Sequence, residues 1–196
     1  IKNSFPLTIA VIRDRISKHP YVKNTDIIMR ERGIVSIKIY EKKMDAILLN
    51  NSEQYLITNI GEIIPLIEST KNIDLPVIID NKQEVNVFAD ASNTPNLFSA
   101  LKILSSAEFF DKSLYKNISE INLVDGDNIS IHLSKFELPI LFGKGDEISK
   151  TVYLSKIYRQ MIKEEIAQYL SYIDLRYNDL VYLGFDDENL SEREKI

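Results

Sequence analysis

Apolar and polar residues follow two periodicities along the chain, and together they predict a fold that mixes helices and strands. Apolar residues recur at helical spacing in residues 7–18, 94–110 and 147–170, which predicts three helices. Elsewhere they alternate with polar residues in short runs that end at Gly, Pro, Asn or Asp, which predicts strands. These strands cover residues 26–30, 34–40, 46–49, 54–58, 62–67, 77–79, 118–124, 128–134 and 136–142. The order of these helices and strands along the chain indicates the α+β class, with mostly antiparallel strands and packed helices.

The first 45 residues predict a helix followed by a β-hairpin. The helix places Ile9, Ile12 and Ile16 on one face, and Pro20 stops it. From residue 46 the pattern changes to short strands and turns, so we place a domain boundary between residues 45 and 46. In the last predicted helix the apolar set is Leu154, Ile157, Met161 and Ile166. We expect this helix to pack on the sheet formed by residues 46–185.

The C-terminal residues predict a final β-hairpin. Two β-prone runs, residues 171–177 and 180–185, flank the polar pair Asn178-Asp179, and an acidic tail follows at residues 186–196. A last strand of this kind often ends a sheet and leaves backbone N–H and C=O groups unpaired. We therefore expect an exposed C-terminal edge strand that can accept a strand from another chain.

Composition excludes several classes of function. The chain has 196 residues, of which 44% are hydrophobic and 27% charged, as in a folded globular protein. Its net charge of −5 argues against nucleic-acid binding. It has no cysteine, so a disulfide framework and a thiol catalyst are both excluded. No apolar run approaches the ~20 residues that a helix needs to cross a bilayer. Because the chain begins at Ile1 rather than Met, we expect upstream sequence to be missing, and any signal or anchor could lie there.

Candidate chemistry is sparse, and the sequence predicts no catalytic residue, metal site or cofactor. His19 and His132 are isolated from each other and from clustered acids, so a solvated or capping role is the better interpretation. Gly143-Lys144-Gly145-Asp146 lacks the spacing of a phosphate-binding loop. The segment 125–128 lacks the later Gly and Glu of a calcium loop and predicts a hairpin turn. Asp174 and Arg176 are two residues apart, which predicts an ion pair on one face of a strand.

Several short motifs resemble the FtsQ/DivIB family of bacterial cell-division proteins, and their order matches over nearly the whole chain. They are Pro20-Tyr21-Val22, Ile28-Met29-Arg30, Ile37-Lys38-Ile39-Tyr40-Glu41, Tyr55-Leu56-Ile57 with Gly61-Glu62-Ile63, Leu75-Pro76, the run from Ile140 to Asp146, and the run from Tyr172 to Tyr177 with Phe185. The chain departs from the family at Tyr21, where tryptophan is common, and at Thr58, where aspartate is common.

The resemblance implies a domain organisation. Residues 1–45 would be the C-terminal part of a POTRA domain, because the first strand and helix of that module have no counterpart here. Residues 46–185 would be an FtsQ-type β domain with an exposed C-terminal edge strand, and residues 186–196 an acidic flexible tail. The resemblance also implies an inner-membrane protein with a single span and this part on the extracytoplasmic, periplasmic side.

The function implied by the resemblance is that of a non-enzymatic scaffold of the divisome. It would link early and late division proteins and bind FtsB and FtsL by strand addition at the C-terminal edge, with FtsK, FtsW and FtsI as further candidate partners. The implied partner-binding residues are Arg176, Tyr177, Leu180, Val181, Tyr182, Leu183, Gly184, Phe185 and Lys144. An alternative hypothesis is a POTRA-bearing module of an outer-membrane secretion or assembly system, and an unrecognised enzyme is a third.

Overall fold

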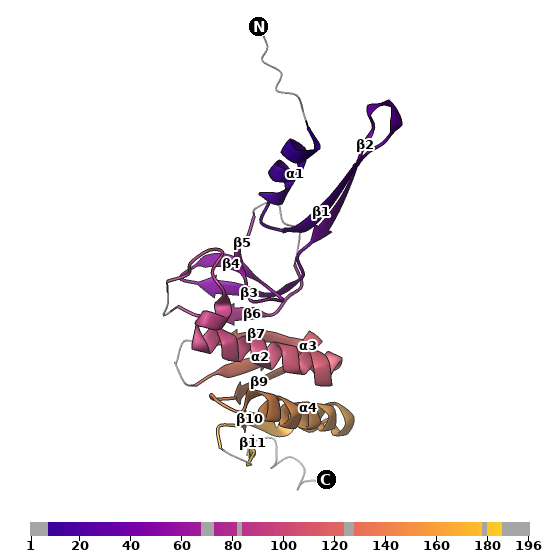
Figure 1. Ribbon diagram of the computed structural model, residues 1–196. Coiled ribbons are helices and arrows are strands. Elements are labelled where there is room, and N and C mark those ends of the chain that lie inside the picture. Colours follow the sequence, from indigo (N-terminus) through magenta and orange to yellow (C-terminus); the bar gives the residue numbers. More distant parts are fainter. Residues whose placement is uncertain (1–7, 68–72, 82–83, 124–127, 178–179, 186–196) are drawn as a thin grey trace. The chain divides into compact units, whose positions relative to one another are not determined.

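The computed structural model describes residues 8–67, 73–81, 84–123, 128–177 and 180–185 (Figure 1). The chain divides into two compact units, Ile1–Met44 and Asp45–Ile196. Three predicted features lie outside the described residues: most of the turn at residues 125–128, the polar pair at residues 178–179 and the acidic tail. The assignment of the first unit to part of a POTRA domain stays a prediction.

The first unit consists of a helix and a hairpin. Helix α1 (Ile9–Ser17) begins after Thr8, whose hydroxyl accepts a hydrogen bond of 3.3 Å from the backbone N–H of Val11. Strands β1 (Val22–Met29) and β2 (Val35–Glu41) pair in antiparallel register across the short helix η1 (Glu31–Gly33). The helix and hairpin agree with the pattern of the sequence.

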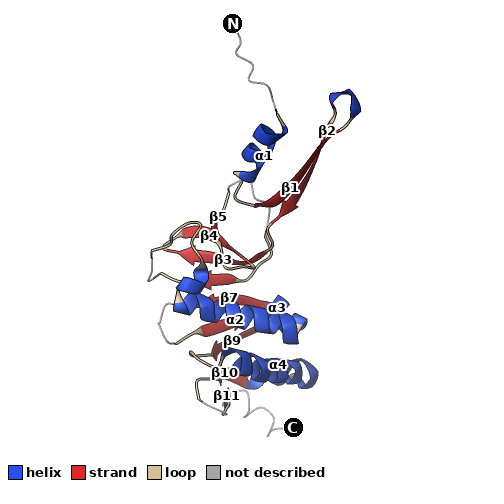
Figure 2. Ribbon diagram, viewed as in Figure 1, coloured by secondary structure: helices blue, strands red, loops and turns tan. Residues whose placement is uncertain are grey.

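The second unit is built on one sheet with helices on one face (Figure 2). Within the described residues the sheet has nine strands in the order β11-β10-β9-β8-β7-β6-β3-β4-β5. Their bounds are β3 Met44–Asn50, β4 Glu53–Thr58, β5 Ile63–Pro65, β6 Val77–Ile79, β7 Ile118–Asn122, β8 Ser130–Leu133, β9 Phe136–Leu141, β10 Leu170–Asp174 and β11 Tyr182–Phe185. The helices are α2 (Pro95–Phe110), α3 (Lys112–Asn117) and α4 (Glu147–Glu164), with short helices η2 (Ala91–Asn93) and η3 (Ile166–Tyr169).

The strands are mostly antiparallel, as the sequence predicts, but three neighbouring pairs among the described strands are parallel. These are β3–β6, β6–β7 and β9–β10. Parallel neighbours need a crossover connection, which is usually a helix. Helices α2 and α3 make the crossover from β6 to β7, and α4 makes it from β9 to β10. The last two strands of the sheet therefore reach their places through α4.

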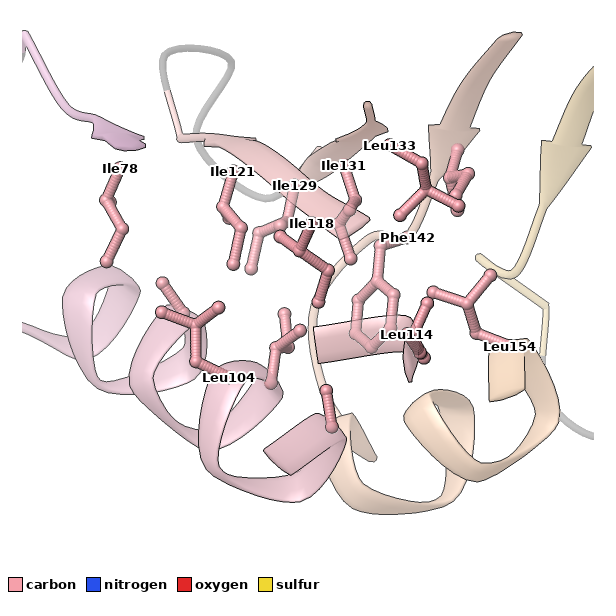
Figure 3. Packing of buried hydrophobic residues seen from close by; sticks show 14 of the residues in the cluster. Ile78, Leu104, Leu114, Ile118, Ile121, Ile129, Ile131, Leu133, Phe142 and Leu154 are labelled. Carbon is pink, nitrogen blue, oxygen red and sulfur yellow. The ribbon is translucent and has the colours of Figure 1, made fainter. Parts of the chain in front are cut away.

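The core of the second unit lies between the sheet and its helices. Ile78, Ile121 and Ile131 point from the strands toward Leu104 and Leu154 of the helices (Figure 3). The predicted inward residues of β8 and its approach, Ile129, Ile131 and Leu133, are all buried. Each large side chain that is fully buried contributes on the order of 1.5–3 kcal/mol of transfer free energy. This core holds the helices against the sheet and confirms the predicted packing of α4.

Two helix boundaries differ from the prediction. Helix α4 ends at Glu164 rather than near residue 170, because Glu165 adopts a left-handed conformation with φ of 53°. No Gly or Pro marks this end, and the apolar residue Ile166 extends the helical pattern beyond it. A separate helix α3 follows α2, because the extended Asp111 ends one helix and its carboxylate caps the next through the N–H groups of Ser113 and Leu114.

Buried polar contacts join α4 to α2 at both ends of the helix pair. Near the start of α4, Glu147 accepts a hydrogen bond of 2.7 Å from the hydroxyl of Ser99. Toward its end, Asp111 accepts hydrogen bonds of 2.9 Å from Ser155 and 2.7 Å from Nε of Arg159. The two contacts fix both the distance and the register between the helices.

The contacts of Asp111 predict a pH-dependent stability. Burial of its carboxylate acts to raise the pKa, but hydrogen bonds from Arg159, Leu114, Ser155 and Ser113 outweigh burial and lower the pKa below its ordinary value. We expect Asp111→Ala to cost about 2 kcal/mol or more of unfolding free energy, because both a helix cap and buried partners are lost. Asp111→Asn keeps a capping oxygen and is the matched control for the charge.

The sign of the pH effect follows from the lowered pKa. The charged carboxylate contributes its full stability above the unfolded-state pKa of about 3.9, and that contribution disappears as the pH falls through the lower folded-state value. In urea titrations the difference between the parent and Asp111→Asn should therefore stay constant from about pH 7 to about pH 5 and shrink from there down to about pH 2. A difference that stays constant down to about pH 2 would show that the charge of Asp111 is not involved.

Candidate functional site

The two edges of the large sheet differ in how their backbone is covered. At one end, segment 88–91 pairs with the outer side of β5, with hydrogen bonds of 2.6 Å from the N–H of Phe88 to the carbonyl of Ile63 and 3.0 Å from the N–H of Ile63 to the carbonyl of Ala89. At the other end stands β11, which pairs with β10 on one side. We call the opposite side of Tyr182–Phe185 the open edge, because no described strand pairs with it.

The register identifies the backbone groups that face this open edge. The N–H of Leu175 donates to the carbonyl of Leu141 at 2.8 Å, so odd-numbered residues of β10 face β9 and even-numbered residues face β11. Asp174 and Tyr172 are opposite Tyr182 and Gly184. The backbone groups of Tyr182 and Gly184 therefore point to β10, and the N–H and C=O of Leu183 point outward.

Both strands of the final hairpin are shorter than predicted. Strand β10 ends at Asp174, whose carboxylate accepts a hydrogen bond of 3.0 Å from the backbone N–H of Arg176 and turns the chain. Strand β11 begins at Tyr182 rather than at residue 180. Of the predicted partner-binding residues, Tyr182, Leu183, Gly184 and Phe185 form the strand. Arg176, Tyr177, Leu180 and Val181 lie in the connection, because the side chain of Asp174 competes with strand pairing.

Asp174 and Arg176 form the predicted ion pair. The distance from Nη2 of Arg176 to Oδ2 of Asp174 is 2.6 Å, and Nε donates to Oδ1 at 3.0 Å. These hydrogen bonds lower the pKa of Asp174, although burial of the carboxylate acts in the opposite direction. The side chain of Asp174 is 6% exposed and that of Arg176 is 40% exposed, so the guanidinium covers the acid and keeps one face in solvent.

The turn that carries Lys144 lies against Arg176, although the two are distant in sequence. Gly143 has φ of 67°, and a Cβ added there would lie 2.9 Å from Cγ of Arg176. The buried Lys150 of α4 holds the turn, because its Nζ donates to the carbonyls of Phe142 and Lys144 at 3.2 Å each. Lys144 and Arg176 line a shared hollow of about 480 Å³. The structure thus brings the two basic residues of the predicted site together.

Exposed aromatic side chains gather on the final hairpin. Tyr177 and Tyr182 are in edge-to-face contact with ring centroids 5.0 Å apart, and each is about half exposed. Phe185 is 52% exposed at the end of β11. Sequence reasoning missed a fourth aromatic residue, Tyr172, which is 39% exposed on the neighbouring strand. The sequence could have predicted that the side chain of Tyr172 points outward, because Tyr172 precedes the inward-facing Ile173 on the same strand.

A second hollow separates α4 from the end of β10. Its volume is about 250 Å³, and its lining residues are Asp146, Ser149, Lys150, Tyr153, Leu175, Tyr177 and Leu180. The predicted site residues Tyr177 and Leu180 therefore face the first turns of α4. This hollow offers partly apolar walls next to the open edge, which suits one side chain of a bound segment.

Other chemistry is not assembled in the described part of the chain. No group of three or more His, Asp or Glu side chains there is placed to hold a metal ion. His132 is exposed on β8, and Nδ1 of His19 accepts a hydrogen bond of 3.2 Å from the N–H of Tyr21. Likewise, no helix among the described residues is long and apolar enough to span a membrane. What the site offers is backbone pairing with aromatic and basic side chains beside it.

The open edge combines unpaired strand backbone with aromatic and basic side chains, and comparison with known proteins identifies the family. Residues 46–176 match the family model described as "Cell division protein FtsQ/DivIB, C-terminal". Because this match covers more than half of the 196 residues, the chain belongs to the FtsQ/DivIB family of cell-division proteins. The resemblance drawn from the sequence motifs is confirmed.

Two curated relatives carry the name cell division protein FtsQ. The protein from Geotalea daltonii is 25% identical over 177 residues, which cover 90% of this chain and 63% of the relative. The protein from Syntrophotalea carbinolica is 22% identical over 184 residues, which cover 94% of this chain and 64% of the relative. The chain thus spans just under two thirds of the length of these curated relatives.

A solved structure with some likeness is the major extracytoplasmic domain of the trans isomer of the bacterial cell division protein DivIB from Geobacillus stearothermophilus. The TM-score is 0.37 at 12% identity, with 63% of this chain and 97% of that chain covered. A likeness at this level carries no argument about the site.

The contact between Gly143 and Arg176 can be tested with a matched pair of variants. Gly143→Ala and Gly145→Ala both place alanine at positive φ, 67° and 80°, which costs about 1–2 kcal/mol each. A Cβ at Gly145 meets nothing within 4 Å, whereas at Gly143 it meets Arg176. We expect Gly143→Ala to have the lower urea midpoint and to change the NMR signal of the Arg176 Nε–H, which Gly145→Ala leaves in place. Equal effects of the two variants would contradict the contact.

Proposed function

We propose that the chain is a non-enzymatic scaffold of the division machinery and that the open edge of β11 accepts a strand from FtsB, with FtsL in the same assembly. The single observation that carries the proposal is the outward N–H and C=O of Leu183 on the last strand of the sheet. Membership of the FtsQ/DivIB family supports the cell-division role. The same membership favours this proposal over an outer-membrane secretion module.

Strand addition explains how a site without catalytic groups gains affinity and specificity. Main-chain hydrogen bonds to Leu183 supply affinity, and pockets for alternate side chains supply specificity. Tyr177, Tyr182 and Phe185 are aromatic anchors of the kind that dominate binding energy at interfaces. The hollow beside Tyr177 and Leu180 would receive one partner side chain.

Lys144 and Arg176 place two basic side chains beside the open edge of a chain whose net charge is −5, and Asp174 pairs with Arg176. Both line the hollow beside the turn at residues 143–145. We propose that an acidic residue of the partner binds there. An exposed basic pair of this kind speeds association more than it raises affinity, because its field acts before contact.

We further propose that a single N-terminal helix outside this chain anchors the protein in the inner membrane, with the described units on the extracytoplasmic, periplasmic side. The domain division at residues 45 and 46 and the tail at residues 186–196 belong to the same proposal. FtsK, FtsW and FtsI are further candidate partners.

Proline substitutions in β11 test strand addition. Leu183→Pro removes an outward N–H and should abolish measurable binding of the extracytoplasmic segment of FtsB while the domain stays folded. Tyr182→Pro is the matched comparison, because it removes an N–H that points to β10 and should instead destabilise the hairpin. Binding is measured by calorimetric titration and folding by circular dichroism. If a folded Leu183→Pro variant binds like the parent, the open edge is not the site.

The aromatic anchors are tested by truncation. Tyr177→Ala and Phe185→Ala should each weaken FtsB binding by about 1–3 kcal/mol, as buried aromatic anchors do. Phe109→Ala is the control, because Phe109 is 82% exposed on α2 and lies outside the proposed site. If both anchor variants bind with the affinity of the parent, the interface lies elsewhere on the protein.

Charge reversal at Lys144 tests whether its charge acts on the rate of FtsB association or on the stability of the complex. Lys144→Glu should lower the association rate constant about tenfold at low salt, with a smaller effect on dissociation. The defect should fade as salt rises to about 0.5 M, because screening shortens the reach of the charge. Stopped-flow binding at several salt concentrations measures both rates, and an effect confined to dissociation would place Lys144 in a desolvated contact instead.

A further inference from the structure

Gly184 in the middle of β11 is covered by an aromatic ring from the neighbouring strand. A Cβ added at Gly184 would lie 2.3 Å from Cε1 and 2.4 Å from Cδ1 of Tyr172. It would also lie 2.7 Å from Oγ of Ser171, whose short side chain can rotate away. Gly184 is absent from the glycines with positive φ, so its backbone does not itself require glycine. The ring of Tyr172, rather than chain conformation, is what excludes a larger residue.

We infer that Tyr172 is a positioning residue for partner binding and that its ring holds β11 in place by packing over Gly184. The inference rests on the proposed function, since it concerns the same open edge. Tyr172 is opposite Gly184 in the register of the two strands. A glycine inside a strand weakens it, and an aromatic ring laid across the glycine from the neighbouring strand restores packing.

The need for such support follows from the geometry of β11. The strand has four residues and pairs on one side, and its register with β10 shifts between Leu170 and Tyr172. Pairing at the end of the strand is therefore weakly specified without a side-chain contact. Gly184 stands between Leu183, whose backbone faces outward, and Phe185, a proposed anchor. By fixing Gly184, the ring orients the backbone groups of Leu183 and the side chain of Phe185.

A competing explanation for glycine at this position is close approach of the partner's own backbone. The two explanations predict different outcomes when the ring and the glycine are changed together. If the ring excludes a side chain at 184, then removing the ring makes room for alanine. If the partner excludes it, removing the ring makes no difference to the alanine variant.

The experiment uses the 196-residue chain and the extracytoplasmic segment of FtsB, with the variants Tyr172→Phe, Tyr172→Ala, Gly184→Ala and the double variant Tyr172→Ala/Gly184→Ala. Tyr172→Phe keeps the ring and should bind like the parent. Tyr172→Ala and Gly184→Ala should each weaken binding about tenfold, and the double variant should bind more tightly than Gly184→Ala alone. Amide hydrogen exchange at Tyr182 and Gly184, whose N–H groups point to β10, should be faster in Tyr172→Ala, while exchange at Ile121 and Ile131 in the centre of the sheet stays the same.

Each outcome is decisive. A double variant no tighter than Gly184→Ala, or unchanged exchange at Tyr182 and Gly184 in Tyr172→Ala, overturns the role of Tyr172. Faster exchange at Ile121 as well would show a general loss of stability and would also overturn it. A parent chain that does not bind the FtsB segment overturns the proposed function itself, and this result is distinguishable because it precedes any comparison of variants.

Discussion

The parallel pairing of β9 with β10 is the constraint on which the open edge of the sheet depends. Two parallel neighbours cannot be joined by a tight turn, so the chain must cross over through α4. The crossover is held by the buried Leu154, Tyr158 and Met161 and by polar contacts to α2 at both ends. Because β10 carries β11, the packing of α4 determines where the open edge stands.

The same helix links the core to the basic residues of the site. Lys150 is buried in α4, yet its ammonium group binds the carbonyls of the turn that presents Lys144. Burial lowers the pKa of Lys150, while nearby acids act to raise it. The turn at residues 143–145 also lies against the aliphatic part of the Arg176 side chain. A change in the core near α4 is therefore transmitted to the proposed binding surface through short, direct contacts.

The sequence was sufficient for most elements and for the final hairpin, but not for the exact bounds of the helices and strands; the binding site stays a prediction. Alternation located the strands and the last hairpin because one face of each strand is buried, as at Ile129, Ile131 and Leu133. The parallel pairs were missed, although a helix between two strands is the usual sign of them. The end of α4 was missed because Glu165 breaks the helix without Gly or Pro. The approach of Gly143 to Arg176 was not predictable, because tertiary packing alone brings them together.

The covered edge at β5 has a consequence for stoichiometry. A sheet with two free edges can join head to tail with further copies, and such heterologous contacts extend into filaments unless they close a ring. Here segment 88–91 occupies the outer side of β5, so within the described residues growth by strand addition is available on one side alone. A head-to-tail series of copies would need both edges, so this sheet does not offer β5 for pairing with the open edge of a second copy.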